Sequence, residues 1–364
     1  FFMRLQKFLS KIGCGSKVPY EINDLPINDS IVKAEYRELL DSVFTIVDTF
    51  PLVALNIGNE HGSWLFNTDD FIGRIGEFMD FFIDAKAYAE FKYEQTHPGE
   101  DLMVGTTFTY AFLTDTNTRE FIKYINDSAY TDMISVNYYG QDTAFNVLPP
   151  EQIPVDFDTL VSIYNDPSKP IYFTECGYQS SDTCNSSEQL QSEFVEQVFN
   201  AWDQHYDQIK YISFFKSTDW SEEVAQYIVD QMAFPGWSDE KRRRFKEYLR
   251  TLGLKNFDNT EKLAYQKLID EATARGFCPE SGVESRDEEK IQVYPNPASD
   301  IFNISGSSIE SIRIFDITGK LMFAKNVKPL TNIDIKTDNW KEGLYFISLF
   351  DGKLLHKRKV VIVK

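Results

Sequence analysis

The sequence contains few of the residues that build metal sites and nucleophile sites. Its 364 residues include four cysteines and four histidines. Neither a CxxC pair nor an HExxH or GxSxG motif is present, so a metalloprotease or serine esterase is disfavoured, and we expect no metal and no cofactor. Cys176 and Cys184 flank a short polar segment. They either form a disulfide in an oxidising compartment or remain free thiols.

Positive charge and long apolar runs are also scarce. Lys and Arg number 37 against 56 Asp and Glu, for a net charge of -19. Nucleic acid is an improbable partner because its phosphates require clustered cations, and an anionic membrane surface is disfavoured for the same reason. No apolar run approaches the roughly 18 residues of a membrane span. The chain opens without Met or a clear signal peptide, so we expect the true N-terminus to be missing.

The chain divides into two parts of opposite charge. Residues 291–364 carry 11 Lys and Arg against 7 Asp and Glu, or +4, which leaves -23 for the rest. Between them, residues 278–290 are polar and charged, as in a linker. We therefore predict an α/β domain over 1–277, a linker over 278–290 and a second domain over 291–364.

The second domain is predicted to be all-β. Short alternating segments are separated by turn residues, with Gly319 and Gly352 expected at hairpin turns. This pattern is typical of a small sandwich. The predicted strands are 291–295, 301–305, 311–319, 320–325, 332–337, 343–350 and 359–364.

In the first domain, strand and helix patterns alternate, which implies a parallel sheet, either open or closed into a barrel. Thr68 is the expected N-terminal cap of the longest helix, and Pro98-Gly99 its stop. The predicted strands are 53–58, 102–110, 132–139, 170–177 and 209–217. The predicted helices are 30–50, 68–99, 116–129, 156–166, 187–208, 221–233, 238–252 and 260–275.

The predicted strands end in residues suited to chemistry. In a barrel, catalytic side chains come from the carboxyl ends of the strands. Two of these ends, far apart in the sequence, carry a glutamate, and paired carboxylates are what cleavage of a glycosidic bond requires. The strand ends are Asn59-Glu60, then Asn137, Tyr138 and Tyr139, then Glu175, then Asp219-Trp220.

"LNIGNE" followed by "IYFTECGY" resembles the retaining glycoside hydrolases of clan A, over roughly residues 7 to 275. The resemblance implies a TIM barrel in which Glu60 is the acid/base and Glu175 the nucleophile. It also implies three substrate-binding or supporting groups. Asn59 binds the sugar 2-hydroxyl, Tyr139 (or Tyr138) hydrogen-bonds the nucleophile, and Trp220 is the sugar platform. His61 either contacts substrate at the rim or is an exposed loop histidine.

The amino-terminal part departs from the clan A pattern. A complete barrel has three β/α units before its Asn-Glu pair, but only 58 residues precede Asn59. They contain one candidate strand near 8–13 and one helix. Strands 1 and 2, with their sugar-binding residues, are expected to be absent. The fold prediction is thus an incomplete (β/α)8 TIM barrel, in a truncated fragment of a hydrolase, followed by a small Ig-like β-sandwich.

The tail motifs "YPNPASDIFNISG", "IRIFDITGK", "GLYFISLFDGK" and "KVVIVK" resemble the C-terminal sorting domain of the type IX secretion system of Bacteroidetes. The resemblance implies the secretion machinery as a partner and a secreted or cell-surface location. A carbohydrate-binding module is the alternative, and it would expose aromatics such as Trp340 and Tyr345. The combined prediction is an exported retaining glycosidase acting on a β-linked polysaccharide. The alternative is a surface carbohydrate-binding protein or pseudoenzyme.

Overall fold

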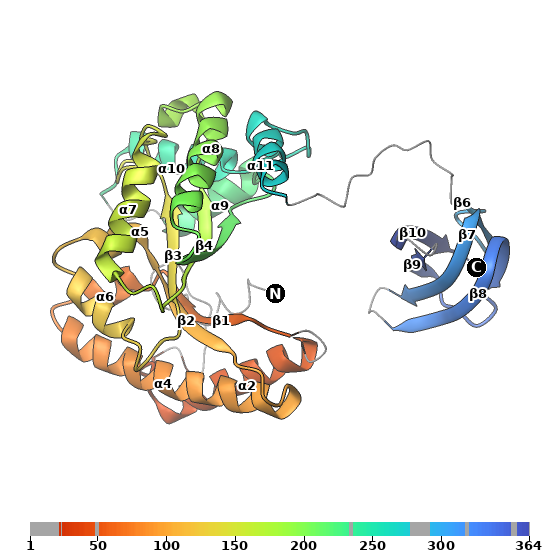
Figure 1. The fold of residues 1–364 in the computed structure, drawn as a ribbon, viewed down its shortest axis with the longest axis horizontal. Helices are drawn as coiled ribbons and strands as arrows, with labels where there is room; N and C mark the ends of the chain where they lie inside the picture. The colour runs from red at the N-terminus through yellow and green to blue at the C-terminus, as the bar shows by residue number, and fades with distance from the viewer. Residues whose placement is uncertain are drawn as a thin grey trace. The chain divides into compact units, whose positions relative to one another are not determined.

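The computed structural model describes residues 22, 24–47, 51–232, 236–276, 292–316, 320–350 and 355–363. The chain separates into two compact units, Phe1–Phe277 and Cys278–Lys364, which are drawn in Figure 1. The candidate strand near 8–13, the predicted linker 278–290, and the turn residues Gly319 and Gly352 lie outside the described residues.

The first unit is built on a parallel sheet in which strand order follows chain order, β1-β2-β3-β4-β5. Sequential order is expected where each strand returns through a helix in the same sense. All five strands were predicted, and the parallel α/β arrangement is consistent with part of a (β/α)8 barrel. Their bounds are β1 Ala54–Asn59, β2 Met103–Thr109, β3 Ile134–Tyr139, β4 Ile171–Gly177 and β5 Ile209–Phe214.

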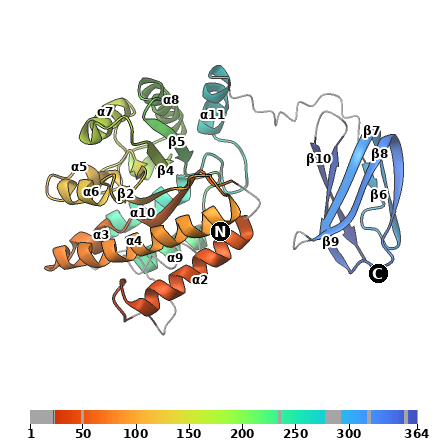
Figure 2. The same cartoon turned by 60° about the horizontal axis from the view of Figure 1, so that its bottom comes forward.

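Helices cover the outer side of this sheet, and α2 lies along α4 in Figures 1 and 2. The predicted stop at Pro98-Gly99 is confirmed because α4 ends at Thr96. The predicted cap is wrong: Asp70, not Thr68, accepts a hydrogen bond from Gly73 N at 3.1 Å. The helices of the layer are α2 Ser30–Val47, α3 Gly62–Phe66, α4 Phe71–Thr96, α5 Tyr110–Thr114, α6 Arg119–Ile125, α7 Gln152–Tyr164, α8 Glu188–Gln204 and α11 Leu263–Ala274.

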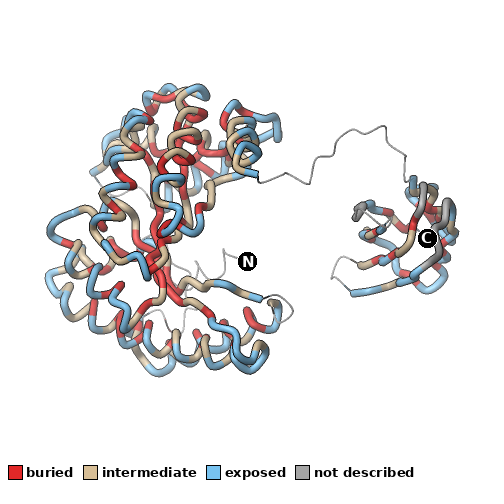
Figure 3. The backbone as a smooth tube through the Cα atoms, viewed as in Figure 1, coloured by how far each residue is buried: buried red, intermediate tan, exposed pale blue. Residues whose placement is uncertain are grey.

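The core fills the space between sheet and helices, where Figure 3 shows the strands and the inner sides of the helices buried. Aromatic rings dominate it. Phe157 and Phe173 stack at 4.5 Å between ring centroids, and Tyr178 and Phe194 stack at 4.8 Å. Each fully buried ring of this kind contributes about 1.5–3 kcal/mol. Aromatic residues make up 15% of the sequence, and many of them lie in this core.

A second, smaller apolar cluster follows β5. Helices α9 (Glu222–Met232) and α10 (Asp239–Thr251) pack together and against the short helix η3 (Asp182–Cys184). A buried ion pair between Lys262 and Asp219, 2.8 Å apart, fixes the loop after β5. Cys176 and Cys184 are both buried and free, which resolves the two alternatives for this pair.

The second unit is antiparallel, with strand order β10-β9-β7-β6 and β8 paired to β7. Two predicted strand pairs are instead single long strands, because β7 and β8 continue across irregular pairing near Ser305 and Ile309. Trp340 and Tyr345 are 8% and 4% exposed, so they belong to the core and form no exposed aromatic row. The bounds are β6 Gln292–Tyr294, β7 Ile301–Asp316, β8 Leu321–Lys336, β9 Gly343–Phe350 and β10 Leu355–Ile362.

Candidate active site

The carboxyl ends of β1, β3 and β4 bring five polar side chains together. The Asn137 amide lies between two of them: its Nδ2 donates to Asn59 Oδ1 at 3.1 Å and to Glu60 Oε1 at 2.9 Å. On the next strand, Glu175 accepts a hydrogen bond from the Tyr139 hydroxyl. Two glutamates separated by 115 residues in the sequence therefore belong to one hydrogen-bonded cluster.

The backbone at the end of β1 turns sharply to present Glu60. Gly58 has φ of +99° and Glu60 has φ of +54°, both in the region that disfavours side chains. A Cβ on Gly58 would also lie 3.0 Å from Thr106 Oγ1, so glycine is required there. The turn is held by Glu60 N, which donates to Thr107 O at 3.0 Å. Left-handed backbone at a non-glycine residue is typical of functional sites.

Irregular strand pairing occurs at this edge of the sheet. The register shifts between Asn56 and Asn59 against β2, and between Val136 and Asn137 against β4. Such bulges re-aim side chains and are common beside active sites. They explain how adjacent parallel strands direct several polar groups to one point.

Asn137 is the central residue of the cluster, although the sequence analysis placed it at a strand end and gave it no role. It is 1% exposed. Thr174 Oγ1 donates to Asn137 Oδ1 at 2.7 Å, which fixes the amide so that its NH2 faces Glu60. The only available sequence signal was a polar residue two positions before Tyr139, on the same face of β3.

Desolvation raises the pKa of both glutamates, and the charge of Glu60 adds to the increase at Glu175. The pKa of Glu175 rises from 4.5 to about 7, first through desolvation and then through the nearby charge of Glu60. Desolvation also raises the pKa of Glu60, while its hydrogen bond from Asn137 opposes the increase. Glu60 is itself exposed, so water moderates its increase. The pair therefore retains a proton at a higher pH than isolated glutamates do.

Hydrogen-bond donors distinguish the two carboxyl groups. Tyr139 donates to Glu175, and the nearby Asn59 and Asn137 amides also lower the pKa of Glu175, whereas Asn137 donates to Glu60 and lowers the pKa of Glu60. Donors stabilise the ionised form. The pKa of Glu175 is therefore set by desolvation and the charge of Glu60, which raise it, against these donors, which lower it.

Tyr138 and Tyr139 point to opposite faces of β3. Tyr138 is buried, and its hydroxyl donates to Asp156 at 2.7 Å, away from the glutamates. Tyr139 packs edge-to-face on Tyr248 of α10, with ring centroids 5.5 Å apart. Burial raises the pKa of both Tyr139 and Tyr248, so their hydroxyls remain protonated. The sequence pattern gives no indication of Tyr248, because α10 reaches the site only through the tertiary fold.

His61 is a core residue, which corrects both sequence expectations for it. Its side chain is fully buried and stacks on Phe78 at 4.3 Å and on Phe108 at 4.5 Å between ring centroids. Desolvation lowers its pKa to about 3, so the ring is neutral. The turn at Glu60 sends the next side chain back into the core, away from any rim.

The loop after β5 carries Trp220. Its ring is half-buried and packs edge-to-face on Phe215. Lys216 Nζ lies 4.0 Å from the centroid of the Trp220 ring, so this ammonium covers one ring face. Trp220 therefore packs against the α9–α10 cluster, which Tyr139 also contacts.

Within the ranges that the structure describes, no group of three or more His, Cys, Asp or Glu could hold a metal ion. No helix in the same ranges is sufficiently long and apolar to cross a membrane.

Solved structures with similar folds are carbohydrate-active proteins. A GH5_18 protein from Streptomyces cattleya in complex with GlcNAc superposes with a TM-score of 0.50 at 14% identity, covering 74% of this chain and 61% of that chain. Bacteroides uniformis β-glucuronidase 2, covalently bound to cyclophellitol-6-carboxylate aziridine, gives 0.47 at 12% identity, covering 99% and 43%. At these identities the likeness describes the fold alone, and the parallel α/β core is consistent with part of a TIM barrel.

Sequence comparisons give one local match to a curated protein and one match to a family model. Over 78 residues, 20% of this chain, the sequence is 38% identical to β-agarase D of Zobellia galactanivorans, and the chain spans 15% of that protein. Residues 292–363 match the model of the secretion system C-terminal sorting domain. The second unit is therefore a type IX secretion sorting domain, and it marks this chain for export to the cell surface or the medium.

Proposed function

We propose that the α/β unit is a retaining glycoside hydrolase that cleaves a β-linked polysaccharide by double displacement. The observation that supports it is the hydrogen-bonded cluster in which Asn137 joins Glu60 to the group around Glu175. Two carboxyl groups with separate hydrogen-bond environments can act as acid and nucleophile on one sugar. The glycosidase-like fold and the export tag agree with a substrate outside the cell.

In the first step, Glu175 attacks the anomeric carbon while Glu60 gives its proton to the departing glycosidic oxygen. The glycosidic bond breaks and an ester to Glu175 forms. In the second step, ionised Glu60 takes a proton from a water molecule while the water oxygen attacks the anomeric carbon. The ester bond to Glu175 breaks, and Glu175 is released as a carboxylate. Asn59 binds the sugar 2-hydroxyl, and the free face of Trp220 supports the ring.

The test is covalent trapping. The chain is incubated with 2-fluoro glycosides that carry an activated leaving group, from a sugar panel that includes galactosides because of the β-agarase D match. Mass spectrometry should find the sugar ester on the peptide containing Glu175, and Glu175→Gln should remove it. In parallel, Glu60→Gln should slow hydrolysis of natural polysaccharide by about 10²–10⁴-fold. An ester on another residue would refute the assignment.

The same assay tests the alternative function. A surface carbohydrate-binding protein would retain polysaccharide on an affinity gel but would never become labelled. Glu35→Gln serves as the matched control, because Glu35 is exposed on α2 and away from the strand ends. Its labelling should equal that of the unsubstituted chain.

A further inference from the structure

Two lysines near the candidate active site lie over tryptophan rings and pair with no carboxylate. Lys216 Nζ is 4.0 Å from the centroid of the Trp220 ring, and Lys241 Nζ is 4.6 Å from that of Trp237. All four side chains are half-buried. Neither ammonium group has a hydrogen bond or an ion pair with any residue that the structure describes. Each ring covers one side of its ammonium group, so N–H donors remain for a ligand.

This lack of a carboxylate partner is unexpected in so acidic a unit. Outside the sorting domain the chain has a net charge of -23, so acidic side chains are abundant. Other cations of α10 pair with them: Arg250 contacts Glu222 at 2.8 Å, and Arg244 contacts Glu240. Lys241, on the same helix, lies over a ring instead.

The acidic residue that acts on Lys216 is already neutralised by another lysine. The Asp219 carboxylate pairs with Lys262 Nζ at 2.8 Å and accepts from Gly253 N at 2.7 Å. Desolvation lowers the pKa of Lys216 to about 8, and the charge of Asp219 opposes this decrease only in part. A cation that has lost water without gaining a partner is stabilised by an anionic ligand.

Close packing places Lys216 beside the strand end that carries Glu175. A Cβ on Gly177 would lie 2.5 Å from Phe215 O and 2.9 Å from Tyr139 Cε1, so these two groups meet at Gly177. Lys216 follows Phe215 directly, and the Tyr139 hydroxyl donates to Glu175. A ligand at Lys216 would therefore lie next to the catalytic strand ends.

A row of aromatic rings connects Lys241 to the same tyrosine. Ring centroids are 5.5 Å apart for Tyr139 and Tyr248, 5.8 Å for Tyr248 and Phe145, and 5.5 Å for Phe145 and Trp237. Lys241 Nζ lies 5.7 Å from the Phe145 centroid as well. Both lysines thus border one aromatic cluster at the active site, and aromatic faces offer apolar surface to sugar rings.

We propose that Lys216 and Lys241 form an anion-binding extension of the active site, which takes the carboxylate or sulfate groups of an acidic polysaccharide. Its sugar rings lie on the aromatic cluster that carries Trp220 and Trp237. The negative charge of the unit repels such a polymer elsewhere, so binding is confined to these cations. The inference rests on the proposed function in taking this polymer as the substrate.

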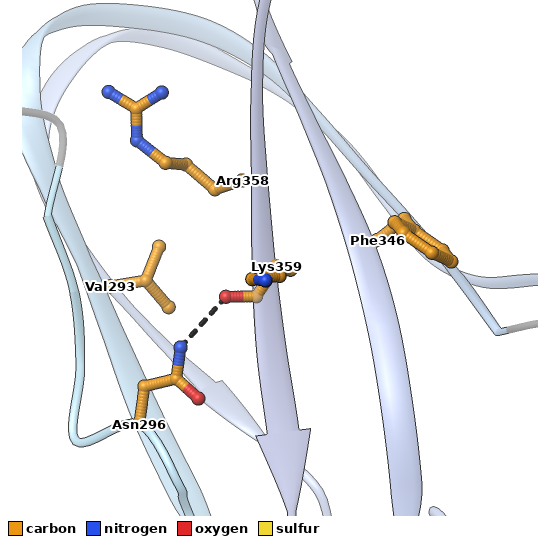
Figure 4. A pocket seen from close by; sticks show the side chains of 5 residues that line it. All are labelled: Val293, Asn296, Phe346, Arg358 and Lys359. Atoms are coloured by element: carbon orange, nitrogen blue, oxygen red, sulfur yellow. Dashed lines mark hydrogen bonds between the residues drawn. The ribbon is translucent and has the colours of Figure 1, made fainter. Parts of the chain in front are cut away.

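Two other readings enter the test as outcomes. A lysine over a tryptophan ring is also a common stabilising contact. The sorting domain has cations too: Figure 4 shows Arg358 and Lys359 beside a pocket of about 470 Å³. There, Asn296 donates to Lys359 O at 2.9 Å, and Arg358 already takes part in an interaction.

The test measures polymer binding by affinity electrophoresis of the full chain carrying Glu175→Gln, which leaves the polymer uncut. The gels contain hydroxyethyl cellulose, carboxymethyl cellulose or cellulose sulfate, so that one β-linked backbone is neutral, carboxylated or sulfated. We expect at least ~10-fold tighter binding to one of the acidic polymers than to the neutral one. The acidic polymer that binds identifies the group, and equal binding of all three overturns the proposal.

Methionine in place of each lysine keeps an unbranched apolar chain over the ring but removes the charge. K216M/K241M should bind the acidic polymer at least ~10-fold more weakly and the neutral polymer equally well, and K216R/K241R should restore the preference. The control K123M/K210M removes two exposed charges from the same unit, and R358Q/K359M removes those of Figure 4. Both should bind like the parent chain.

An unchanged acidic preference in K216M/K241M, with or without a lower unfolding temperature, would mean that the ring contacts only stabilise the fold. Equal loss in K123M/K210M, or loss in R358Q/K359M alone, would also refute the proposal. If the double variant does not fold, each single variant takes its place. Binding is measured without hydrolysis, so failed trapping with acid-selective binding rejects the glycosidase alone. Trapping without acid preference rejects this inference alone.

Discussion

The Glu175→Gln variant gives the sharpest test of the electrostatics at the candidate site. The pKa of Glu175 rises from 4.5 to about 7 in the folded chain, and this difference corresponds to about 3 kcal/mol. The folded state holds the proton more tightly than the unfolded chain does. This contribution to stability is therefore complete below about pH 4.5 and is lost as the pH rises through about 7.

Glutamine has the shape of glutamic acid but does not titrate, and its carbonyl oxygen can still accept from Tyr139. The free energy of unfolding of the first unit should fall between pH 4.5 and about 8 in the unsubstituted chain, by about 1–3 kcal/mol more than in Glu175→Gln. Glu175 is partly exposed, so screening by water can reduce this difference to the lower value of about 1 kcal/mol. At high pH the variant should thus be the more stable chain, although hydrolysis is lost.

The measurement is urea unfolding followed by tryptophan fluorescence, since four of the five tryptophans lie within residues 1–277. Glu35→Gln, on the exposed side of α2, should show the same pH dependence as the unsubstituted chain. If the Glu175→Gln and unsubstituted curves run parallel across this pH range, the carboxyl group is not desolvated as described, and the argument for a coupled pair fails.

Three other substitutions test neighbouring parts of the structure. Tyr139→Phe removes a donor that lowers the pKa of Glu175, so the acid limb of the pH–rate profile should move to higher pH and activity should fall about 10–100-fold; an unchanged profile would contradict this role. His61→Ala should destabilise the chain by about 2–5 kcal/mol in thermal or urea unfolding, as expected for a core residue, with KM unchanged; a raised KM at full stability would instead restore the rim prediction. Lys262→Met leaves Asp219 buried and unpaired at a cost of about 3–5 kcal/mol, and adding Asp219→Asn should recover much of it; no recovery would show that the pair is not the cause.

The sequence predicted the five parallel strands, the longer helices and the strand ends that carry the glutamates, because parallel strands bring their carboxyl ends to one edge whatever the details of packing. The orientation of Asn137 could not be predicted, since it depends on Thr174 from the next strand. His61 was misplaced because Phe78 and Phe108, which enclose it, come from distant segments. The long strand β7 was predicted as two, since its irregular middle looks like a turn in isolation.

The groups that lower the pKa values of the two glutamates include no cation. The groups that most strongly oppose the pKa increase of Glu60 and Glu175 are neutral: two amides and the Tyr139 hydroxyl. A lysine or arginine in their place would lower both pKa values and leave two stable anions, neither able to donate a proton. Neutral donors leave the repulsion between the carboxyl groups only partly compensated. A sugar that develops positive charge at its anomeric carbon would complete the compensation, so such a site would bind the transition state more strongly than the ground state.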